Sequence, residues 1–168
     1  MATGGINSSF QFQTYKIDRI EYQTTHDIGL LQRYKAIDTD KFEIFFRIRV
    51  PNRIKKEKIY ISGFDVKFIQ YSDDSRMEEK FIFKGEMGIV GIFKVMDDSF
   101  DEDQINSLAK IQAPALLLPY LRSAITSLFT NNGFGSFIFP LINIHKLAES
   151  SVQDLEIVDL EQIPPYKK

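Results

Sequence analysis

Apolar and polar residues alternate through most of the first half of the chain, and this pattern predicts β-strands. The clearest run covers residues 42–50, FEIFFRIRV, which are apolar at every second position. Comparable runs cover residues 10–24, 59–71 and 79–95. The apolar phase slips near Thr14 and Arg19 in the first run, and at Gly63 in the third, where we expect a β-bulge. The periodicity fades over 26–40, which predicts a loop. Four antiparallel strands follow from this pattern.

Three glycines, Gly85, Gly88 and Gly91, interrupt the last of these runs. Glycine weakens a strand unless another group packs close to its backbone. We therefore expect another element or subunit to approach the sheet here. The glycines are not a nucleotide-binding fingerprint, because no strand–turn–helix unit encloses them.

Helical periodicity dominates the second half. Ser99 is the expected cap of a short helix over 102–110, and Pro114 is expected to end it, because the residue before a proline avoids the helical region. A longer helix is predicted over 115–131, closed by an Asn-Asn-Gly stop, and a short one from Asn143 to about residue 151. Strands followed by helices, without βαβ alternation, predict an α+β fold.

Length and composition fit one domain spanning 1–168, with 1–9 and 152–168 as flexible tails. A chain of 168 residues can bury ~70% of its unfolded surface in one core. A net charge of −2 argues against a nucleic-acid binder. No apolar run approaches the ~20 residues of a membrane span, so we expect no membrane insertion. The start of the chain lacks the pattern of a secretory signal, and there is no cysteine, which together favour the cytoplasm.

No pattern of residues indicates an enzyme, a metal site or a cofactor. The two histidines, His26 and His145, lie in unrelated elements without a partner motif. The carboxylates of 97–103 lack the glycine and terminal glutamate of a calcium loop, which favours a solvated helix start. We therefore expect a protein that binds through its surface.

The most unusual segment is 112–147, which combines an apolar helix with an aromatic extended run. Phe134, Phe137 and Phe139 could belong to the core, as such rings usually do, or line a groove. The glycines at 133 and 135 favour an exposed, adaptable segment, and contiguous exposed apolar surface usually marks a partner site. We expect at least two of the three rings to face a groove.

Motifs that follow one another in the family's order make the chain resemble the SecB family of chaperones. FQFQTYKI at 10–17 is similar to the family's first strand, and FIFKGEMGIVGIF at 81–93 is similar to a later strand, with Gly88 at the family's glycine. The helix start, helix stop and entry into the last helix correspond to Pro114, Pro119, Tyr120 and Arg122, then Gly133, then Pro140, Asn143 and Ile144. Ile142 stands where the family often has a second proline.

This resemblance implies a four-stranded antiparallel sheet with a long helix and a short C-terminal helix packed on one face. It also implies a homotetramer, a dimer of dimers, that holds unfolded polypeptides or preproteins in apolar grooves without a cofactor. The residues expected to line the groove are Phe10, Phe12, Phe45, Phe134, Phe137, Ile138, Phe139 and Leu141. The residues expected at the oligomer interface are Leu117, Leu118, Leu121, Ile125 and Leu128.

One departure from the family bears on the partner. Export-type members dock the motor SecA through acidic residues on the sheet, and these positions correspond here to Arg19, Gln23 and Lys84, with Asp18 one residue from the first. Charge reversal would replace attraction by repulsion. Three functions stay open: preprotein export with delivery to SecA, a dedicated chaperone such as one guarding the antitoxin of a toxin–antitoxin system, and a protein that reuses the fold to bind an apolar ligand. The lost acidic positions favour a chaperone without strong SecA docking.

Overall fold

The structure is a computed structural model that describes residues 9–135, 137–151 and 155–161. Its strands are β1 (Phe10–Thr24), β2 (Phe42–Ile48), β3 (Asn52–Ile54), β4 (Ile59–Tyr71), β5 (Phe81–Val95) and β6 (Val158–Asp159). Its helices are α1 (Ile28–Arg33), α2 (Glu102–Ser107), α3 (Ala113–Asn131) and α4 (Ile144–Ser150), with a 3₁₀ turn at Lys55–Glu57 and a π-helical turn at Leu108–Gln112.

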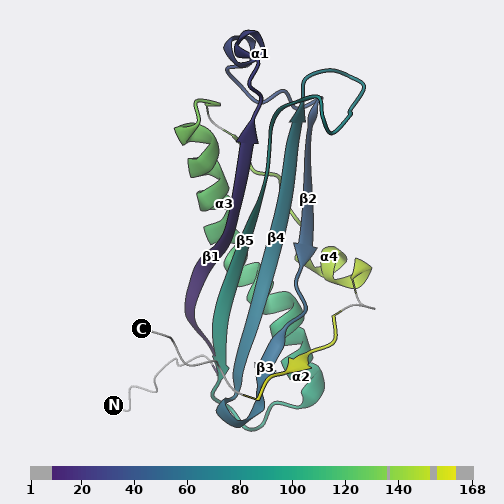
Figure 1. Ribbon diagram of the computed structural model, residues 1–168. Coiled ribbons are helices and arrows are strands. Elements are labelled where there is room, and N and C mark those ends of the chain that lie inside the picture. The colour runs from purple at the N-terminus through teal and green to yellow at the C-terminus, as the bar shows by residue number, and fades with distance from the viewer. Residues whose placement is uncertain (1–8, 136, 152–154, 162–168) are drawn as a thin grey trace, which may run out of the picture.

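The strands form one sheet in the order β1-β5-β4-β3-β6, with β2 pairing the other half of β4. α3 lies across one face of the sheet, and α4 lies near β2 (Figure 1). The predicted α+β class and the antiparallel arrangement of the long strands are confirmed. Two details differ. The predicted strand 42–50 ends at Ile48 as β2, and an unpredicted strand, β3, follows Pro51, which cannot donate to a ladder. β6 adds a short parallel pair with β3.

The two phase slips predicted in the first strand are real. The pairing of β1 with β5 shifts register between Phe12 and Thr14 and again between Ile17 and Arg19. Each shift returns the apolar residues of β1 to the face that carries the helices, because an extra residue reverses the alternation.

The bulge predicted at Gly63 is wrong. β4 pairs with β5 in continuous register through this glycine, so Tyr60 and Ser62 share the helix-facing side with Phe64. The buried Ser62 hydroxyl donates a hydrogen bond to the carbonyl of Ala109 at 2.6 Å, which satisfies its polar group beneath the π-helical turn. Ile59 consequently lies on the opposite face.

The expected close approach to the glycines of β5 is confirmed, and its purpose differs along the strand. A Cβ at Gly91 would lie 2.7 Å from Leu117 Cδ2, so α3 packs directly on the backbone there. A Cβ at Gly88 would lie 2.1 Å from Arg49 Nη2, on the opposite face. The strand is thus approached from both sides.

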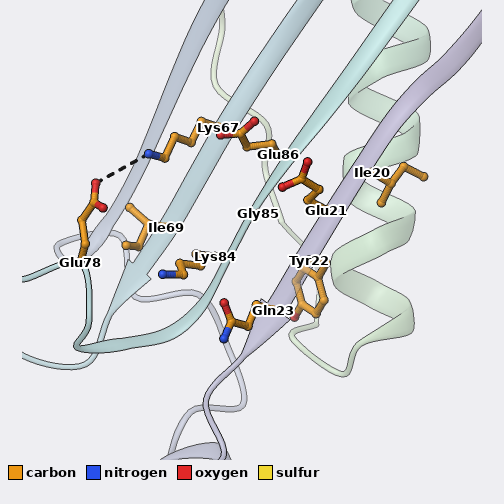
Figure 2. A pocket seen from close by; sticks show the side chains of 10 residues that line it. All are labelled: Ile20, Glu21, Tyr22, Gln23, Lys67, Ile69, Glu78, Lys84, Gly85 and Glu86. Carbon is orange, nitrogen blue, oxygen red and sulfur yellow. Dashed lines mark ion pairs between the residues drawn. The ribbon is translucent and has the colours of Figure 1, made fainter.

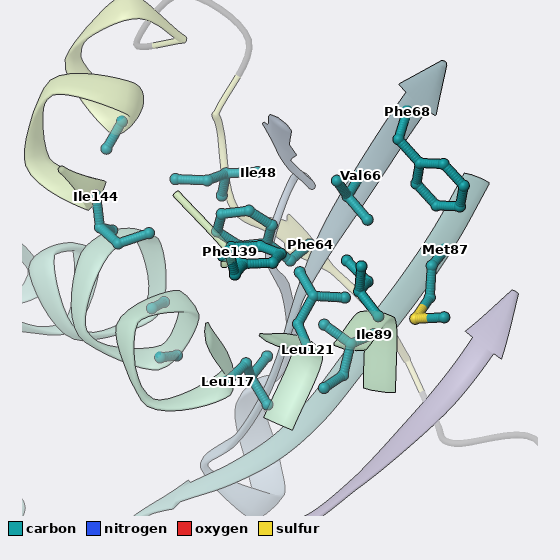
Figure 3. Packing of buried hydrophobic residues seen from close by; sticks show 14 of the residues in the cluster. Ile48, Phe64, Val66, Phe68, Met87, Ile89, Leu117, Leu121, Phe139 and Ile144 are labelled. Carbon is teal, nitrogen blue, oxygen red and sulfur yellow. The ribbon is translucent and has the colours of Figure 1, made fainter. Parts of the chain in front are cut away.

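The core lies between the sheet and α3. Figure 3 shows Leu117 and Leu121 of α3 among the buried side chains of β4 and β5. Phe129 contributes a ring 5.0 Å from that of Phe68 and 5.3 Å from that of Phe83, centroid to centroid. The helix therefore buries its apolar stripe against the sheet of its own protomer.

The helical region begins at Glu102, as predicted, but its cap lies two residues later than expected, and the region runs without a break into α3. Asp101 is the cap of α2, in a capping box with Gln104 whose two hydrogen bonds measure 2.8 and 2.9 Å. Ser99, the expected cap, lies outside the helix. Pro114 does not end the helix, because it sits in the first turn of α3, where its missing N–H loses least. The predicted loop 26–40 contains the short helix α1.

Most of the expected flexible tails, 1–8, 152–154 and 162–168, lie outside the described residues. Within residues 155–161, Leu155 is 2% exposed and β6 pairs with β3, so this part of the expected tail is held against the sheet.

Candidate functional site

The segment between α3 and α4 presents apolar side chains to solvent while its rings hold it in place. Phe137 packs edge-on against Phe42 at 5.2 Å between centroids, and Phe139 packs against Phe46 at 5.5 Å. The residue between these rings, Ile138, is 90% exposed. Leu141, just beyond them, is 93% exposed. Phe137 and Phe139 thus anchor the segment, while Ile138 between them and Leu141 beyond them stay uncovered.

The expectation that at least two of Phe134, Phe137 and Phe139 face a groove is wrong. Phe134 is 4% exposed, with its ring 4.5 Å from that of Phe83. Phe139 is also 4% exposed, and Phe137 is half-buried. The rings fill the space between the sheet and the end of α3, where burial of apolar surface stabilises the fold. Flanking glycines did not indicate exposure, because a positive φ at Gly133 and Gly135 serves only to turn the chain.

Of the groove residues expected on the strands, some are likewise buried and one is exposed. Phe10 is buried, stacked on Phe93 at 5.1 Å, and Phe12 is half-buried beside the same ring. Phe45 is 54% exposed on the face of β2 opposite the helices, beside Lys67 of β4. The expected groove residues that stay open to solvent are therefore Phe45, Ile138 and Leu141.

The residues predicted for the oligomer interface belong mainly to the protomer core. Leu117, Leu121 and Ile125 are fully buried beneath the sheet, whereas Leu118 and Leu128 are half-buried. Helical periodicity identified the buried stripe correctly, but it cannot tell a sheet from a second subunit as the covering surface.

A second exposed apolar cluster escaped the sequence analysis. Tyr15 of β1 and Tyr120 of α3 lie 4.3 Å apart between ring centroids and are about two-fifths exposed, and Leu116 beside them is 46% exposed. We call these three residues the tyrosine patch. Only the positions of Leu116 and Tyr120 off the buried stripe of α3 hinted at it.

The face of the sheet opposite the helices carries an ion network centred on Arg49. Its side chain lies over Gly63 and Gly88, crosses β4 and β5, and reaches Asp18 on β1. Arg49 donates to both Asp18 oxygens at 2.5 and 2.9 Å and to Asp65 Oδ1 at 2.6 Å. Arg47 donates to the other Asp65 oxygen at 2.8 Å. Burial alone would raise the pKa of Asp65, but the hydrogen bonds from Arg49 and Arg47 outweigh it and hold that pKa below its usual value.

The residues expected at the motor-docking positions lie on this same face. Gln23 and Lys84 are opposite each other in the β1–β5 pairing and line one hollow of about 680 Å³ (Figure 2). Arg19 bridges Glu21 at 2.7 Å and Glu86 at 2.9 Å, both of which line that hollow. Asp18 is occupied by Arg49. The four residues thus share one surface, which is balanced in charge instead of acidic.

This hollow does not have the character of an apolar ligand pocket. Half of its ten lining residues are charged, namely Glu21, Lys67, Glu78, Lys84 and Glu86. The Tyr22 hydroxyl at its margin is buried without a hydrogen-bond partner among the described residues, and burial raises the pKa of Tyr22 to about 12. Within the described residues, no three or more His, Cys, Asp or Glu side chains gather where they could hold a metal ion. The helices of that same part of the chain are too short or too polar to cross a membrane.

The chain is similar to proteins of one known family. The family model described as preprotein translocase subunit SecB matches residues 63–154, more than half of the chain. The protein-export protein SecB of Hydrogenovibrio crunogenus is 32% identical over 93 residues, which cover 51% of this chain and 61% of that protein. The SecB of Burkholderia vietnamiensis is 28% identical over 109 residues, 65% of this chain and 67% of that protein. The chain thus spans between about half and two thirds of the curated relatives it matches.

A solved structure supports the same fold. The SecB-like chaperone of Mycobacterium tuberculosis, solved in complex with a peptide from an antitoxin, superposes with a TM-score of 0.59 over 80% of this chain and 91% of that chain, at 9% sequence identity. At this identity the likeness shows the fold alone. The family match over residues 63–154, more than half of the chain, shows that the chain belongs to the SecB family.

Proposed function

We propose that this protein is a chaperone that holds unfolded polypeptides on its surface. The observation that carries the proposal is the exposure of Ile138 and Leu141, on a segment that Phe137 and Phe139 anchor by packing against β2. Leaving such side chains in water costs free energy, and burying each large one against a client contributes ~1.5–3 kcal/mol.

Backbone pairing is a second source of affinity. Within the described residues, β2 pairs only with β4, so its other edge is open to an extended client strand. Main-chain hydrogen bonds are independent of client sequence, which suits a protein that binds many unfolded chains. Such binding requires no cofactor.

We further propose that the working form is a homotetramer in the cytoplasm. The tyrosine patch leaves apolar surface on α3 and β1 that a second copy would cover. Several client sites on one assembly raise the effective concentration, so a long client is held more tightly than a short peptide. Light scattering that finds a stable monomer at micromolar concentration would contradict this assembly.

A dedicated client, such as an antitoxin, is favoured over delivery to SecA by one observation. Asp18 is bound by Arg49, and the remaining docking positions carry Arg19, Gln23 and Lys84, so the sheet face offers no acidic patch to a basic motor tail. The structurally similar mycobacterial chaperone was solved with a peptide from an antitoxin. An apolar-ligand function is less well supported, because half of the residues that line the hollow beside Gln23 and Lys84 are charged.

The holding function is tested by replacing the two exposed side chains together, in I138S/L141S. Because both lie in solvent, the melting temperature should change by no more than a few degrees, while suppression of aggregation of an unfolded client should fall several-fold. The matched control is I28S, which removes a 70% exposed isoleucine from α1, away from this segment. Equal protection by the double variant and by the control would remove residues 137–142 from the client site.

A further inference from the structure

The C-terminal segment adds a strand to the sheet at a place where another extended peptide would fit. β6 runs parallel to β3, with Asn52 opposite Val158 and Arg53 opposite Asp159. The amide of Val158 donates to the carbonyl of Pro51 at 2.9 Å, and the amide of Leu160 donates to the carbonyl of Arg53 at 2.7 Å. These bonds use only main-chain groups, so any extended chain could make them.

Side-chain contacts of Arg53 and Leu155 make the docking selective. The Arg53 side chain is 13% exposed, and its guanidinium donates to both oxygens of Asp159, at 2.7 and 3.3 Å. A second branch of the same guanidinium holds Glu102 of α2 at 2.9 Å, which orients Arg53 independently of the C-terminal segment. A fixed guanidinium fork recognises a carboxylate in a defined direction.

Leu155 supplies the apolar anchor. It is 2% exposed and belongs to the core cluster with Ile48 and Ala148, next to the place where β2 ends. Val158 and the Asp159 side chain, by contrast, are about half exposed. The docked segment therefore combines one deeply held leucine with an extended, solvent-facing stretch that carries an acid four residues later.

We propose that the β3 edge with Arg53 is a strand-docking site for an extended acidic–apolar peptide, which residues 155–161 occupy in the resting protein and which a client segment of the same pattern displaces. The inference deepens the proposed function, since it rests on that function for the nature of the competing partner. The site itself, however, can be tested without any client. Because the occupant is part of the same chain, its effective concentration is high, and a free peptide competes poorly until the segment is released.

The first test is hydrogen exchange of the full-length wild-type protein. The amides of Val158 and Leu160 should exchange more slowly than in a free peptide of the same sequence, since both are hydrogen-bonded to β3. Exchange of both amides at the free-peptide rate would show that the segment does not dock, and the proposal would fail there.

The second test supplies the peptide in trans. In the full-length variant V158P/D159K, the proline removes the donor to Pro51 and the lysine repels Arg53. A fluorescein-labelled peptide LEIVDLE, the sequence of 155–161, should bind this variant at least about ten-fold more tightly than it binds the wild type, as measured by anisotropy. The matched control is E161K, which makes the same charge change beyond β6 and should behave as wild type.

The peptide carrying the D159K change should bind the released variant several-fold more weakly than LEIVDLE, because it loses the contact with Arg53. Equal binding of LEIVDLE to wild type and variant, or equal binding of the two peptides, would overturn the proposal. The result does not depend on chaperone activity: failure of the wild type to protect an unfolded client would reject the proposed function and leave the peptide titration unchanged.

Discussion

At the residue scale, glycines decide what can cross the sheet. Arg49 reaches Asp18 because Gly63 and Gly88 present no side chain beneath it, so one cation links β1 with β4 and the end of β2. On the other face, Gly91 allows Leu117 to seat α3 against β5. Glycine thus makes room for an ion network on one face and for a buried helix contact on the other. Replacing it by alanine should therefore change the stability by different amounts at the two positions.

We expect G91A to destabilise the protein by ~1–3 kcal/mol, because the new Cβ would lie 2.7 Å from Leu117 Cδ2 and 2.9 Å from Phe93 in a close-packed core. G88A should cost less, ~1 kcal/mol or below, because the atoms that the new Cβ meets are the ends of flexible side chains at the surface, which can shift. Urea unfolding of the two variants measures both values. The reverse order would mean that Arg49 contributes more to the fold than α3 packing at this point.

Asp65 should give the ion network a signature in acid. Its pKa is lowered in the folded protein, so the stability it contributes is present above the ordinary value of 3.8 and is lost as the pH falls through the folded pKa. The free energy of unfolding of the wild type, measured with urea, should therefore fall as the pH is lowered from 3.8. In D65N this component should be missing, and the difference between the two proteins should narrow in acid. A constant difference from neutral pH to acid would rule out this role.

At the element scale, periodicity predicted the architecture. It failed where the apolar face of an element could pack either on its own sheet or on a second subunit. The bounds and phase slips of β1 followed from its own residues, because burial of one face constrains the register. The stripe of Leu117, Leu121 and Ile125 was identified, but the sheet of the same protomer covers it. β6 could not be predicted, since two residues have no periodicity and their strand exists only through pairing with β3.

The aromatic segment shows the same limit and carries a prediction. Replacing Phe134 by alanine should lower the free energy of unfolding by ~3–5 kcal/mol, because the ring is buried against Phe83 and leaves a cavity. Thermal melting should show a fall of many degrees, unlike that of I138S/L141S in the same segment. A melting temperature within a few degrees of wild type would return Phe134 to the client-binding surface.

At the scale of the whole molecule, the two sheet faces have separate tasks. One face is covered by α3 and by the aromatic segment, and it supplies stability, while Ile138 and Leu141 at its margin stay exposed to solvent. The opposite face carries balanced ion pairs around Arg49 and Arg19, and a partner protein would meet it without an acidic patch. The charges of this face are therefore separate from the packing that stabilises the fold.

The charge of the sheet face opposite the helices predicts how strongly the protein binds SecA. Wild type should bind a peptide of the SecA tail weakly or not at all, because Arg19 and Lys84 repel a basic partner. In R19D/Q23E/K84E, the loss of Arg19 also releases Glu21 and Glu86 from their ion pairs, so the hollow becomes strongly acidic. Calorimetry should then show binding that strengthens as salt is lowered, since exposed charges are screened within ~10 Å at 0.1 M ionic strength. Melting temperatures should stay similar, because these side chains are surface groups. Tight binding by wild type, or none by the triple variant, would place the docking surface elsewhere on the molecule.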